Sequence, residues 1–244
     1  MLHATLPAET LYAVLNALTA VVEKCDLRFD DDGLSVQATQ PSEMQFALIT
    51  LPNTTFNAYD ADDVAVTIDV SKLETNLTRY PIENPVTLSL TNNERTLQFH
   101  TPTLTYNYSL SDPPMTWTPT RIPTIASPVT FELTGADLNR IVTVADWLSS
   151  KLTVEIDTAS NQLYCEATGD SDTVSERIHL EAIDHPDITS SATYPLKYVH
   201  PIQHSIPDTT PVHVTLDAES STPLKLQYPL SDHGSHVTYY IRSI

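Results

Sequence analysis

The segment SDPPMTWTPTRIPTIASP, residues 111–128, divides the chain into two parts of similar length. It holds five of the chain's 18 prolines and no glycine, and it has neither helical nor strand periodicity. Because proline fixes φ and lacks a backbone donor, such a run is extended, exposed and fairly stiff. We call residues 111–128 the connector, because the sequences on its two sides resemble each other.

Three segments before the connector match three segments after it, at an offset of 126 or 127 residues. The matched pairs are 6–11 (LPAETL) with 133–138 (LTGADL), 85–90 (PVTLSL) with 211–216 (PVHVTL), and 96–99 (TLQF) with 223–226 (PLKL). One register is therefore kept across most of each half. The sequence predicts two copies of one domain, residues 1–110 and 129–244, joined by the connector.

The composition agrees with two intracellular domains. At 244 residues the chain has room for two cores, each built from about 115 residues. Its two cysteines, Cys25 and Cys165, fall one in each half, which argues against a disulfide framework and favours a reducing compartment. The N-terminus has no basic region before an apolar core, and no apolar run reaches membrane-spanning length. We expect a soluble cytoplasmic protein with both cysteines buried.

The charge is strongly negative. The 31 acidic residues against 12 basic ones give a formal net charge of −19, and the sequence pI is about 4.5. Such a surface repels bare nucleic acid at ordinary ionic strength. It suits a cytoplasm of very high salt, because the Debye length shrinks to roughly 3 Å at 1 M and screens the self-repulsion. The composition therefore indicates a halophilic source.

Hydrophobic periodicity predicts four helices and many short strands. The helices are expected at 8–24, at 71–79 behind a capping box at Ser71, at 135–148 behind a capping box at Thr134, and at 194–205 with Pro201 inside. The predicted strands are 2–6, 27–29, 34–36, 46–48, 64–68, 86–90, 96–100, 103–110, 131–133, 152–156, 163–167, 174–181, 212–216, 224–230 and 237–241. One-sided alternation makes antiparallel sheet with one covered face. The predicted class is α+β, with two helices on antiparallel sheet in each half.

Catalytic and cofactor motifs are absent from the sequence. There is no nucleotide-binding glycine motif, and with four glycines in all there is no phosphate-cradling loop to propose. His200 and His204 have a spacing that suits zinc, but no cysteine or acidic residue accompanies them locally, which favours a solvated helix face. No serine–histidine or cysteine–histidine arrangement stands out. We expect no active site, no cofactor and no metal, and therefore a protein that is not an enzyme.

The end of the chain resembles the sliding-clamp family of proliferating cell nuclear antigen (PCNA), found in archaea and eukaryotes. The resemblance is most specific in 223–228 (PLKLQY), 231–234 (SDHG) and 237–241 (VTYYI), which look like the family's terminal hairpin. Supporting matches are 30–36 (DDDGLSV), 71–73 (SKL) and 135–146, with Arg140 in its first turns. The similarity covers nearly the whole chain and keeps its order.

The resemblance implies a sliding clamp, in which three subunits close a ring around duplex DNA with helices lining the hole. The implied DNA-facing residues are Lys72, Arg79, Arg140, Lys197, His200 and His204. The first helix departs from the basic inner face of many relatives, because it shows Tyr12, Ala13 and Thr19 there. At molar salt phosphate contacts contribute little, so a weakly interacting hole fits a ring that is held by topology.

The resemblance also implies a site for partner peptides, formed by the connector, a loop and the terminal residues. The matching positions, which we call the partner-site residues, are Met44, Phe46, Ile122, Pro123, Pro223, Tyr240, Ile241, Arg242 and Ser243. Arg242 departs from the small residue common at that place. The expected partners are DNA polymerase, the clamp loader, a flap nuclease and ligase.

Two alternating strands are candidate subunit interfaces, because exposed sheet edges are natural templates for strand pairing. They are 103–110 and 174–180, and the candidate interface residues are Tyr106, Tyr108, Leu110, Glu176, Arg177 and Ile178. Two alternatives remain open. One is an acidic structural or interaction protein that shares only the duplicated β architecture, and the other is a hydrolase whose site assembles from distant residues. A homotrimer that binds clamp-motif peptides would exclude both.

Overall fold

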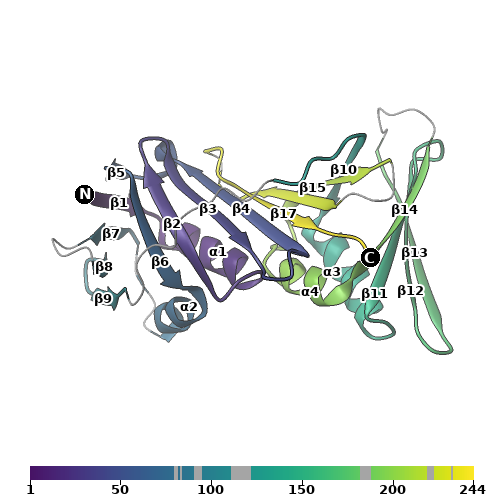
Figure 1. The fold of residues 1–244 in the computed structure, drawn as a ribbon, viewed down its shortest axis with the longest axis horizontal. Coiled ribbons are helices and arrows are strands. Elements are labelled where there is room, and N and C mark those ends of the chain that lie inside the picture. Colours follow the sequence, from purple (N-terminus) through teal and green to yellow (C-terminus); the bar gives the residue numbers. More distant parts are fainter. Residues whose placement is uncertain are drawn as a thin grey trace. The chain divides into compact units, whose positions relative to one another are not determined.

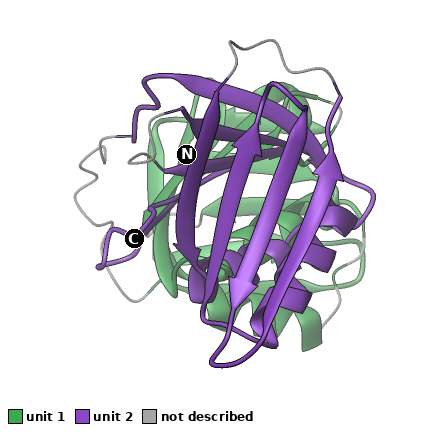
Figure 2. Cartoon of the chain, turned by 90° about the vertical axis from the view of Figure 1, so that its right-hand side faces the viewer, with its two compact units in different colours: residues 1–39, 47–120, 229–237 green, residues 40–46, 121–228, 238–244 purple. Residues whose placement is uncertain are grey.

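The computed structural model describes residues 1–79, 82, 84–90, 95–110, 122–181, 188–218, 223–231 and 233–244. Residues 111–121 of the connector, Trp117 among them, thus lie outside the described residues. Contacts divide the chain into two compact units (Figure 2). Unit 1 comprises 1–39, 47–120 and 229–237, and unit 2 comprises 40–46, 121–228 and 238–244. The domain boundaries expected from the repeat, at 110 and 128, stay a prediction.

Unit 1 contains two antiparallel sets of strands and two helices that pack on each other (Figure 1). The strand orders are β5-β1-β7-β8-β9 and β4-β3-β2-β6. The elements are β1 (Leu2–Leu6), α1 (Ala8–Thr19), β2 (Lys24–Asp30), β3 (Gly33–Thr39), β4 (Gln45–Pro52, in unit 1 from residue 47), η1 (Asn53–Thr55), β5 (Ala58–Ala61), β6 (Val64–Asp69), α2 (Val70–Arg79), β7 (Val86–Leu90), β8 (Thr96–His100) and β9 (Thr105–Ser109).

Unit 2 repeats this plan, with α3 and α4 packed together and α3 against four strands. The strand orders are β13-β12-β11-β14 and β10-β15-β16-β17. The elements are β10 (Pro128–Thr134), α3 (Gly135–Asp146), β11 (Lys151–Asp157), β12 (Gln162–Thr168), β13 (Thr173–His179), β14 (Thr189–Pro195), α4 (Leu196–His204), β15 (Pro211–Asp217), β16 (Leu224–Pro229, in unit 2 to residue 228) and β17 (His236–Ile241, in unit 2 from residue 238).

The strand registers confirm the duplication predicted from the sequence. In unit 1, β1 pairs with β7 so that Leu6 lies opposite Val86. In unit 2, β10 pairs with β15 so that Leu133 lies opposite Val212. Leu6 with Leu133 and Val86 with Val212 are the residues that the sequence repeat aligns. The α+β class with two tandem copies of one domain is therefore confirmed.

Alternation and helical spacing explain how each unit closes its core. Along β10 the side chains of Val129, Phe131 and Leu133 are buried, and the residues between them are exposed. On α3 the buried side chains include Leu138 and Ile141, which follow helical spacing. Burying a side chain of this size contributes about 1.5–3 kcal/mol. The apolar positions thus fix which face of each element turns inward.

Several predicted boundaries are wrong. The first helix ends at Thr19, five residues early, because the N–H groups of Val21 and Val22 both bond the Leu18 carbonyl in a turn before β2. The second helix begins at Val70, and its cap is the Asp69 carboxylate, which accepts from the Lys72 N–H at 2.8 Å. An ionised oxygen is the stronger acceptor at a helix N-terminus, so Ser71 is not the cap.

The sequence also failed to predict two strands. Strand β5 is only four residues long, and β14 (TSSATYP) lacks regular apolar alternation. Because β14 extends to Pro195, the fourth helix begins at Leu196, two residues later than predicted, and runs to His204 with Pro201 inside. Both strands are placed by pairing with a neighbour, β1 for the first and β11 for the second.

The two cysteines are free and buried, as predicted. Burial raises the pKa of each thiol to about 12. Because the thiolate is the reactive form, neither side chain is set up for chemistry in the folded protein. Both act as small core residues.

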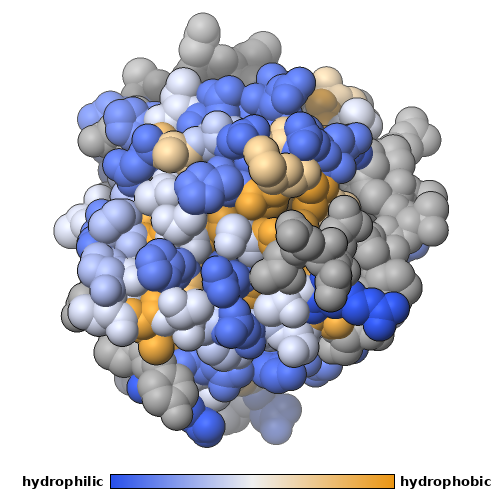
Figure 3. Space-filling view, turned by 90° about the vertical axis from the view of Figure 1, so that its left-hand side faces the viewer, coloured by the Kyte–Doolittle hydropathy of each residue, from blue (hydrophilic) through white to orange (hydrophobic). Residues whose placement is uncertain are grey.

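Figure 3 shows the end of unit 1 that carries β1, β5, β7, β8 and β9, and most of it is hydrophilic around a central apolar area.

No helix in the described part of the chain is long and apolar enough to cross a membrane.

We predict that Gly135→Ala destabilises unit 2. A Cβ at this position would lie 2.1 Å from the Pro207 carbonyl oxygen and 3.2 Å from the Asp208 Cα, and both atoms belong to the backbone. Overpacking of this kind costs roughly 1–3 kcal/mol. Chemical denaturation at fixed salt measures the loss. The exposed neighbour gives the control, since Ala136→Ser should change the free energy of unfolding by less than about 0.5 kcal/mol.

Candidate functional site

Unit 2 brings together two of the three parts expected to form the partner site. The backbone N–H of Arg242 donates to the Met44 carbonyl at 2.9 Å. The rings of Phe46 and Tyr240 lie 5.8 Å apart between centroids, at a tilt of 56°. The loop at 40–46 and the terminal residues therefore form one surface, and all of the partner-site residues belong to unit 2.

The partner-site residues divide into an accessible group and a supporting group. Phe46, Pro223 and Ile241 are buried, so they support the surface from below. The accessible or partly accessible ones are Met44, Ile122, Pro123, Tyr240, Arg242 and Ser243. Ile122 is 39% exposed, a large fraction for an isoleucine side chain. An apolar residue that stays in water at this place is consistent with a site for a partner.

Asp217 holds the described end of the connector. Its Oδ2 accepts from the N–H groups of Ala126 at 2.7 Å and Ser127 at 3.1 Å. Asp217 is the last residue of β15, and its side chain is buried. Ile122 and Pro123 lie a few residues before Ala126 in the connector, so they stand close in sequence to a point where its backbone is fixed.

The loop at 40–46 is held by polar contacts with α4 and by its own turn. The Gln45 Nε2 donates to the Tyr198 carbonyl at 2.9 Å, and the Ser42 and Tyr198 hydroxyls lie 3.4 Å apart. The Ser42 contact lowers the pKa of Tyr198, with Lys197 contributing in the same direction. Within the turn, Glu43 has a φ of 54°, the left-handed region that a non-glycine residue rarely adopts.

The terminal residues continue past β17 along a second strand. The Ile244 N–H donates to the Thr193 carbonyl of β14 at 3.0 Å. Beneath them the Tyr239 hydroxyl lies 3.0 Å from the Ser205 hydroxyl, and burial raises the Tyr239 pKa well above its ordinary value. Burial also raises the pKa of Tyr240, which therefore presents a neutral ring and hydroxyl to the surface.

The DNA-facing candidates of unit 1 lie on α2. Lys72 and Arg79 are both exposed. The Lys72 Nζ lies 5.5 Å from the centroid of the Tyr108 ring, a distance at which a cation is attracted to an aromatic face. Arg79 is the last residue of the helix, where a positive charge complements the helix dipole.

Arg140 in unit 2 is compensated by two carboxylates. Its Nη2 lies 3.1 Å from an oxygen of Asp137, and its Nε lies 2.5 Å from an oxygen of Glu176. The hydrogen bond with Glu176 is the main reason that the Arg140 pKa is raised. The local sum of these three charges is negative. Lys197, the other basic residue of this set in unit 2, lies with its Nζ 4.7 Å from the Tyr198 ring centroid.

The two histidines of α4 lie side by side. Their Nε2 atoms are 3.3 Å apart, and Asp146 of α3 has an oxygen 3.9 Å from the His200 Nε2. The structure thus supplies the acidic neighbour that the local sequence lacks. Even so, no three or more His, Cys, Asp or Glu side chains within the described ranges are grouped so that they hold a metal ion.

Both strands predicted as interfaces are edge strands. β9 ends the order β5-β1-β7-β8-β9, and β13 begins the order β13-β12-β11-β14. Tyr106 and Tyr108 turn toward their own unit, because their hydroxyls accept from the Asn76 side chain at 2.8 Å and from the Asp69 N–H at 2.9 Å. What β9 offers a partner is therefore mainly its backbone, since Tyr108 is only 3% exposed. Leu110, which follows β9, is partly exposed, and its N–H bonds the Arg95 carbonyl at 2.9 Å.

The hydrogen-bond register tells which N–H groups of β13 are paired. The Leu180 N–H donates to the Asn161 carbonyl, and Ile178 lies opposite Leu163. Because paired and unpaired positions alternate in an antiparallel ladder, the N–H of Ile178 points to β12 and that of Arg177 points to the open edge. A proline at Ile178 would therefore remove a bond within the unit's own sheet, so a test of this edge needs the proline at Arg177.

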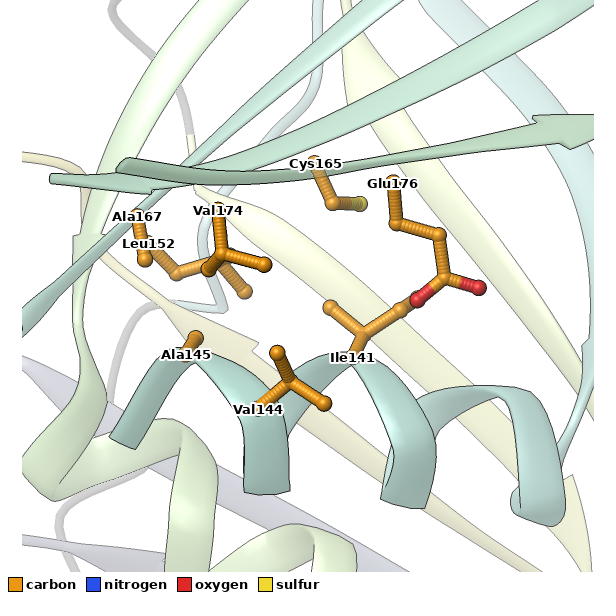
Figure 4. A pocket seen from close by; sticks show the side chains of 8 residues that line it. All are labelled: Ile141, Val144, Ala145, Leu152, Cys165, Ala167, Val174 and Glu176. Carbon is orange, nitrogen blue, oxygen red and sulfur yellow. The ribbon is translucent and has the colours of Figure 1, made fainter. Parts of the chain in front are cut away.

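A small cavity lies between α3 and the strands β11, β12 and β13. Figure 4 shows Cys165, Val174 and Glu176 extending from the sheet toward Ile141, Val144 and Ala145 of the helix. Its volume of about 10 Å³ is close to the minimum that holds a single water. It is therefore a packing gap and no ligand pocket.

Two residues that matter to these surfaces were not predicted from the sequence. Nothing in the sequence predicts the left-handed backbone conformation of Glu43, because that conformation arises only in the folded turn. Trp147 follows α3 and is 79% exposed, the largest exposed fraction among the large apolar side chains of the described residues. The sequence analysis placed Trp147 inside the helix predicted at 135–148 and gave it no role.

Comparison with known proteins gives consistent relatives. Residues 1–109 match the family model described as "Proliferating cell nuclear antigen, N-terminal domain". The chain is 30% identical over 242 residues to a "DNA polymerase sliding clamp" of Halobacterium salinarum, covering 99% of this chain and 97% of the relative. It is 26% identical over 244 residues to the "DNA polymerase sliding clamp" of Natronomonas pharaonis, with the same coverage.

Solved structures show the same fold at lower identity. PCNA from Thermococcus kodakaraensis superposes with a TM-score of 0.89 at 17% identity and covers all of both chains. A structure described as "C-terminal region of FEN-1 bound to A. fulgidus PCNA" has a TM-score of 0.87 at 19% identity, covering 100% of this chain and 98% of that chain.

We predict that Thr134→Ala weakens unit 2 in a pH-dependent way. Thr134 and Asp137 form a capping box, in which the Thr134 hydroxyl donates to Asp137 at 2.6 Å and lowers the pKa of that carboxyl. At pH 7 the loss should be about 1 kcal/mol. A lowered folded pKa means that this stabilisation is complete above the ordinary value of 3.8 and is lost as the pH falls through the folded value.

Denaturation of the two proteins between pH 7 and pH 3 measures this difference. It should shrink below about pH 4, where the carboxylate becomes protonated. Thr143→Ala on the same helix is the control, because the Thr143 hydroxyl donates to the Asn139 side-chain oxygen at 2.9 Å, and that amide does not titrate in this pH range. A difference that stays constant down to pH 3 would contradict the assigned role of Asp137.

Proposed function

Because the chain belongs to the family of DNA polymerase sliding clamps, we propose that it closes as a homotrimeric ring around duplex DNA and tethers a replicative polymerase. The observation that carries the proposal is the 30% identity to the clamp of Halobacterium salinarum over nearly the full length of both chains. The halophilic relatives also support the halophilic source inferred from the net charge of −19.

The charge arrangement supports attachment by topology rather than by affinity. Arg140 is neutralised by Asp137 and Glu176, and the chain as a whole repels phosphate. A closed ring needs no tight contact to stay on DNA, and weak contacts let it slide. At high salt basic side chains would add little, because affinity from phosphate neutralisation falls steeply as salt rises. Lys72, Arg79, Arg140, Lys197, His200 and His204 then serve as non-specific backbone contacts.

The ring would close through backbone pairing between the two edge strands. β9 of one subunit adds to β13 of the next, and each supplies the N–H and carbonyl groups that its own sheet leaves unpaired. The interface residues Tyr106, Tyr108, Leu110, Glu176, Arg177 and Ile178 flank this pairing. Tyr106 and Tyr108 stabilise β9 from behind, and Glu176 ties β13 to α3 through Arg140.

Partner enzymes would bind at the partner-site residues through short peptides. A helical turn would place apolar and aromatic anchors against Met44, Tyr240 and Ile122, while backbone pairing with the connector fixes its direction. The polymerase, the clamp loader, a flap nuclease and ligase are the partners proposed. The protein would act in the cytoplasm as a processivity factor and not as an enzyme. An acidic structural protein, the alternative, would have no need of such a site.

We expect a trimer in high salt that depends on the open edge of β13. Arg177→Pro removes the outward N–H, whereas Arg177→Ala keeps it and removes only the side chain. Light scattering after size exclusion should give a monomer for the proline variant and a trimer for the alanine variant and the wild type. Far-UV circular dichroism checks that the monomer is folded, since edge strands tolerate proline.

A trimer that survives Arg177→Pro would exclude this edge as the interface. If that variant fails to fold, Asn107→Pro replaces it, because Asn107 occupies the corresponding outward position on β9.

The clamp activity itself is tested by primer extension on circular DNA. With a polymerase and clamp loader from a halophilic archaeon, the protein should lengthen the products on a primed circle. The effect should disappear on a linear template, from whose ends a ring slides off. Because phosphate contacts add little at high salt, replacing Lys72, Arg79, Arg140 and Lys197 by glutamine should reduce the lengthening only modestly, and to a similar extent on every template sequence. Equal stimulation on linear and circular templates, or a sequence-dependent defect, would contradict the proposal.

A further inference from the structure

One residue of the partner site is not explained by apolar anchors. Arg242 is the only one of the nine partner-site residues with a charged side chain, and that side chain is 57% exposed. We propose that Arg242 binds a carboxylate on the partner peptide, so that this site selects peptides with an acidic residue beside their apolar anchors. The inference rests on the proposed function and deepens it.

The backbone of Arg242 is held in place. The backbone N–H of Arg242 donates to the Met44 carbonyl at 2.9 Å, and the residue before it, Ile241, is fully buried. One residue earlier, Tyr240 packs on Phe46. The Cα of Arg242 is therefore held next to the candidate anchor surface while its guanidinium extends into water. A group held in this way loses less conformational freedom on binding than one on a free loop.

The guanidinium already faces a carboxylate, but loosely. Its Nη2 lies 3.7 Å from the Glu43 Oε2, and the Glu43 side chain is 70% exposed. This separation exceeds the 2.7–2.9 Å of a charge-assisted hydrogen bond. Pairs of this kind between exposed side chains contribute little, so a ligand carboxylate can displace Glu43. A guanidinium also has donors for two parallel hydrogen bonds to one carboxylate, which the present contact does not use.

Glu43 is thus an internal competitor placed by its backbone. Its φ of 54° and the bond from its N–H to the Gln40 carbonyl at 2.9 Å turn the side chain at this point of the loop. Residues in that region of φ are uncommon outside glycine and cluster at ligand-binding sites. A carboxylate held near Arg242 marks the position where a ligand carboxylate would lie.

The surrounding charge makes this contact selective. With a net charge of −19 the protein as a whole repels acidic peptides. At molar salt that long-range repulsion is screened within roughly 3 Å, whereas a contact at hydrogen-bond distance is screened less. Arg242 therefore provides a local attraction for one carboxylate that is correctly placed, and gives no general preference for acidic chains.

The test uses pairs of labelled clamp-motif peptides that differ by one glutamate or glutamine, placed in turn at each position flanking the anchors. Dissociation constants are measured by fluorescence anisotropy in 1 M and 3 M KCl. For at least one position the wild type should bind the glutamate peptide about 2- to 5-fold more tightly, as expected for one exposed charge pair. Arg242→Gln should remove this preference, because both peptides then meet a neutral side chain at this position. Glu43→Gln should increase the preference, because it removes the competitor.

The possible results distinguish a failure of the inference about Arg242 from a failure of the proposed partner site. Tight binding of both peptides with no preference at any position would overturn the role of Arg242 and leave the clamp function intact. An equal loss of both peptides in Arg242→Gln would also overturn it, since it would show a packing role. Partial preference in Arg242→Lys would support a role for charge with lost bidentate geometry. If no peptide binds the wild-type trimer, the partner site itself is wrong, and the inference falls with it.

Discussion

Aspartate carboxylates that accept backbone N–H groups hold the points where this chain changes direction. Asp69 caps α2, and Asp137 completes the capping box of α3 by accepting from the Thr134 N–H. Asp217 holds the end of the connector through two N–H groups, and Asp157 holds the turn after β11. Each bond satisfies a donor that would otherwise need water, and each places a negative charge where the backbone already offers positive dipoles. Part of the strong acidity is therefore structural, and the helices, strands and surfaces depend on these junctions.

The sequence predicted the structure best where a pattern repeats along the chain, and least well where a single contact determines the local backbone conformation. The duplication could be predicted because Leu6 and Leu133 pair in equivalent ways with Val86 and Val212. The end of α1 could not, because Val21 and Val22 keep helical spacing and only the turn at Leu18 shows that they have left the helix. For the candidate site, the sequence brought Phe46 and Tyr240 together correctly. It could not reveal the conformation of Glu43, which arises in the folded turn at 40–46, or the inward direction of the Ile178 N–H, which depends on the register with β12.

The basic residues of the helices show why counting charges misjudges such a surface. Arg140 is exposed and would be scored as a DNA contact, yet two carboxylates share it. Lys72 and Lys197 each lie over a tyrosine ring of their own unit. These side chains already contact groups of their own unit, so they are only partly available to a ligand. In the proposed ring this would be an advantage, because a lining that holds DNA weakly would offer little resistance to movement along it.

The two buried thiols have a practical consequence. Cys25 and Cys165 are the only cysteines of the chain, and burial keeps both in the unreactive protonated form with a pKa of about 12. A cysteine introduced at an exposed position would then be the one site open to a maleimide dye in the folded protein. The native sequence is already suited to single-molecule tracking, and one label per chain can be attached without altering either core.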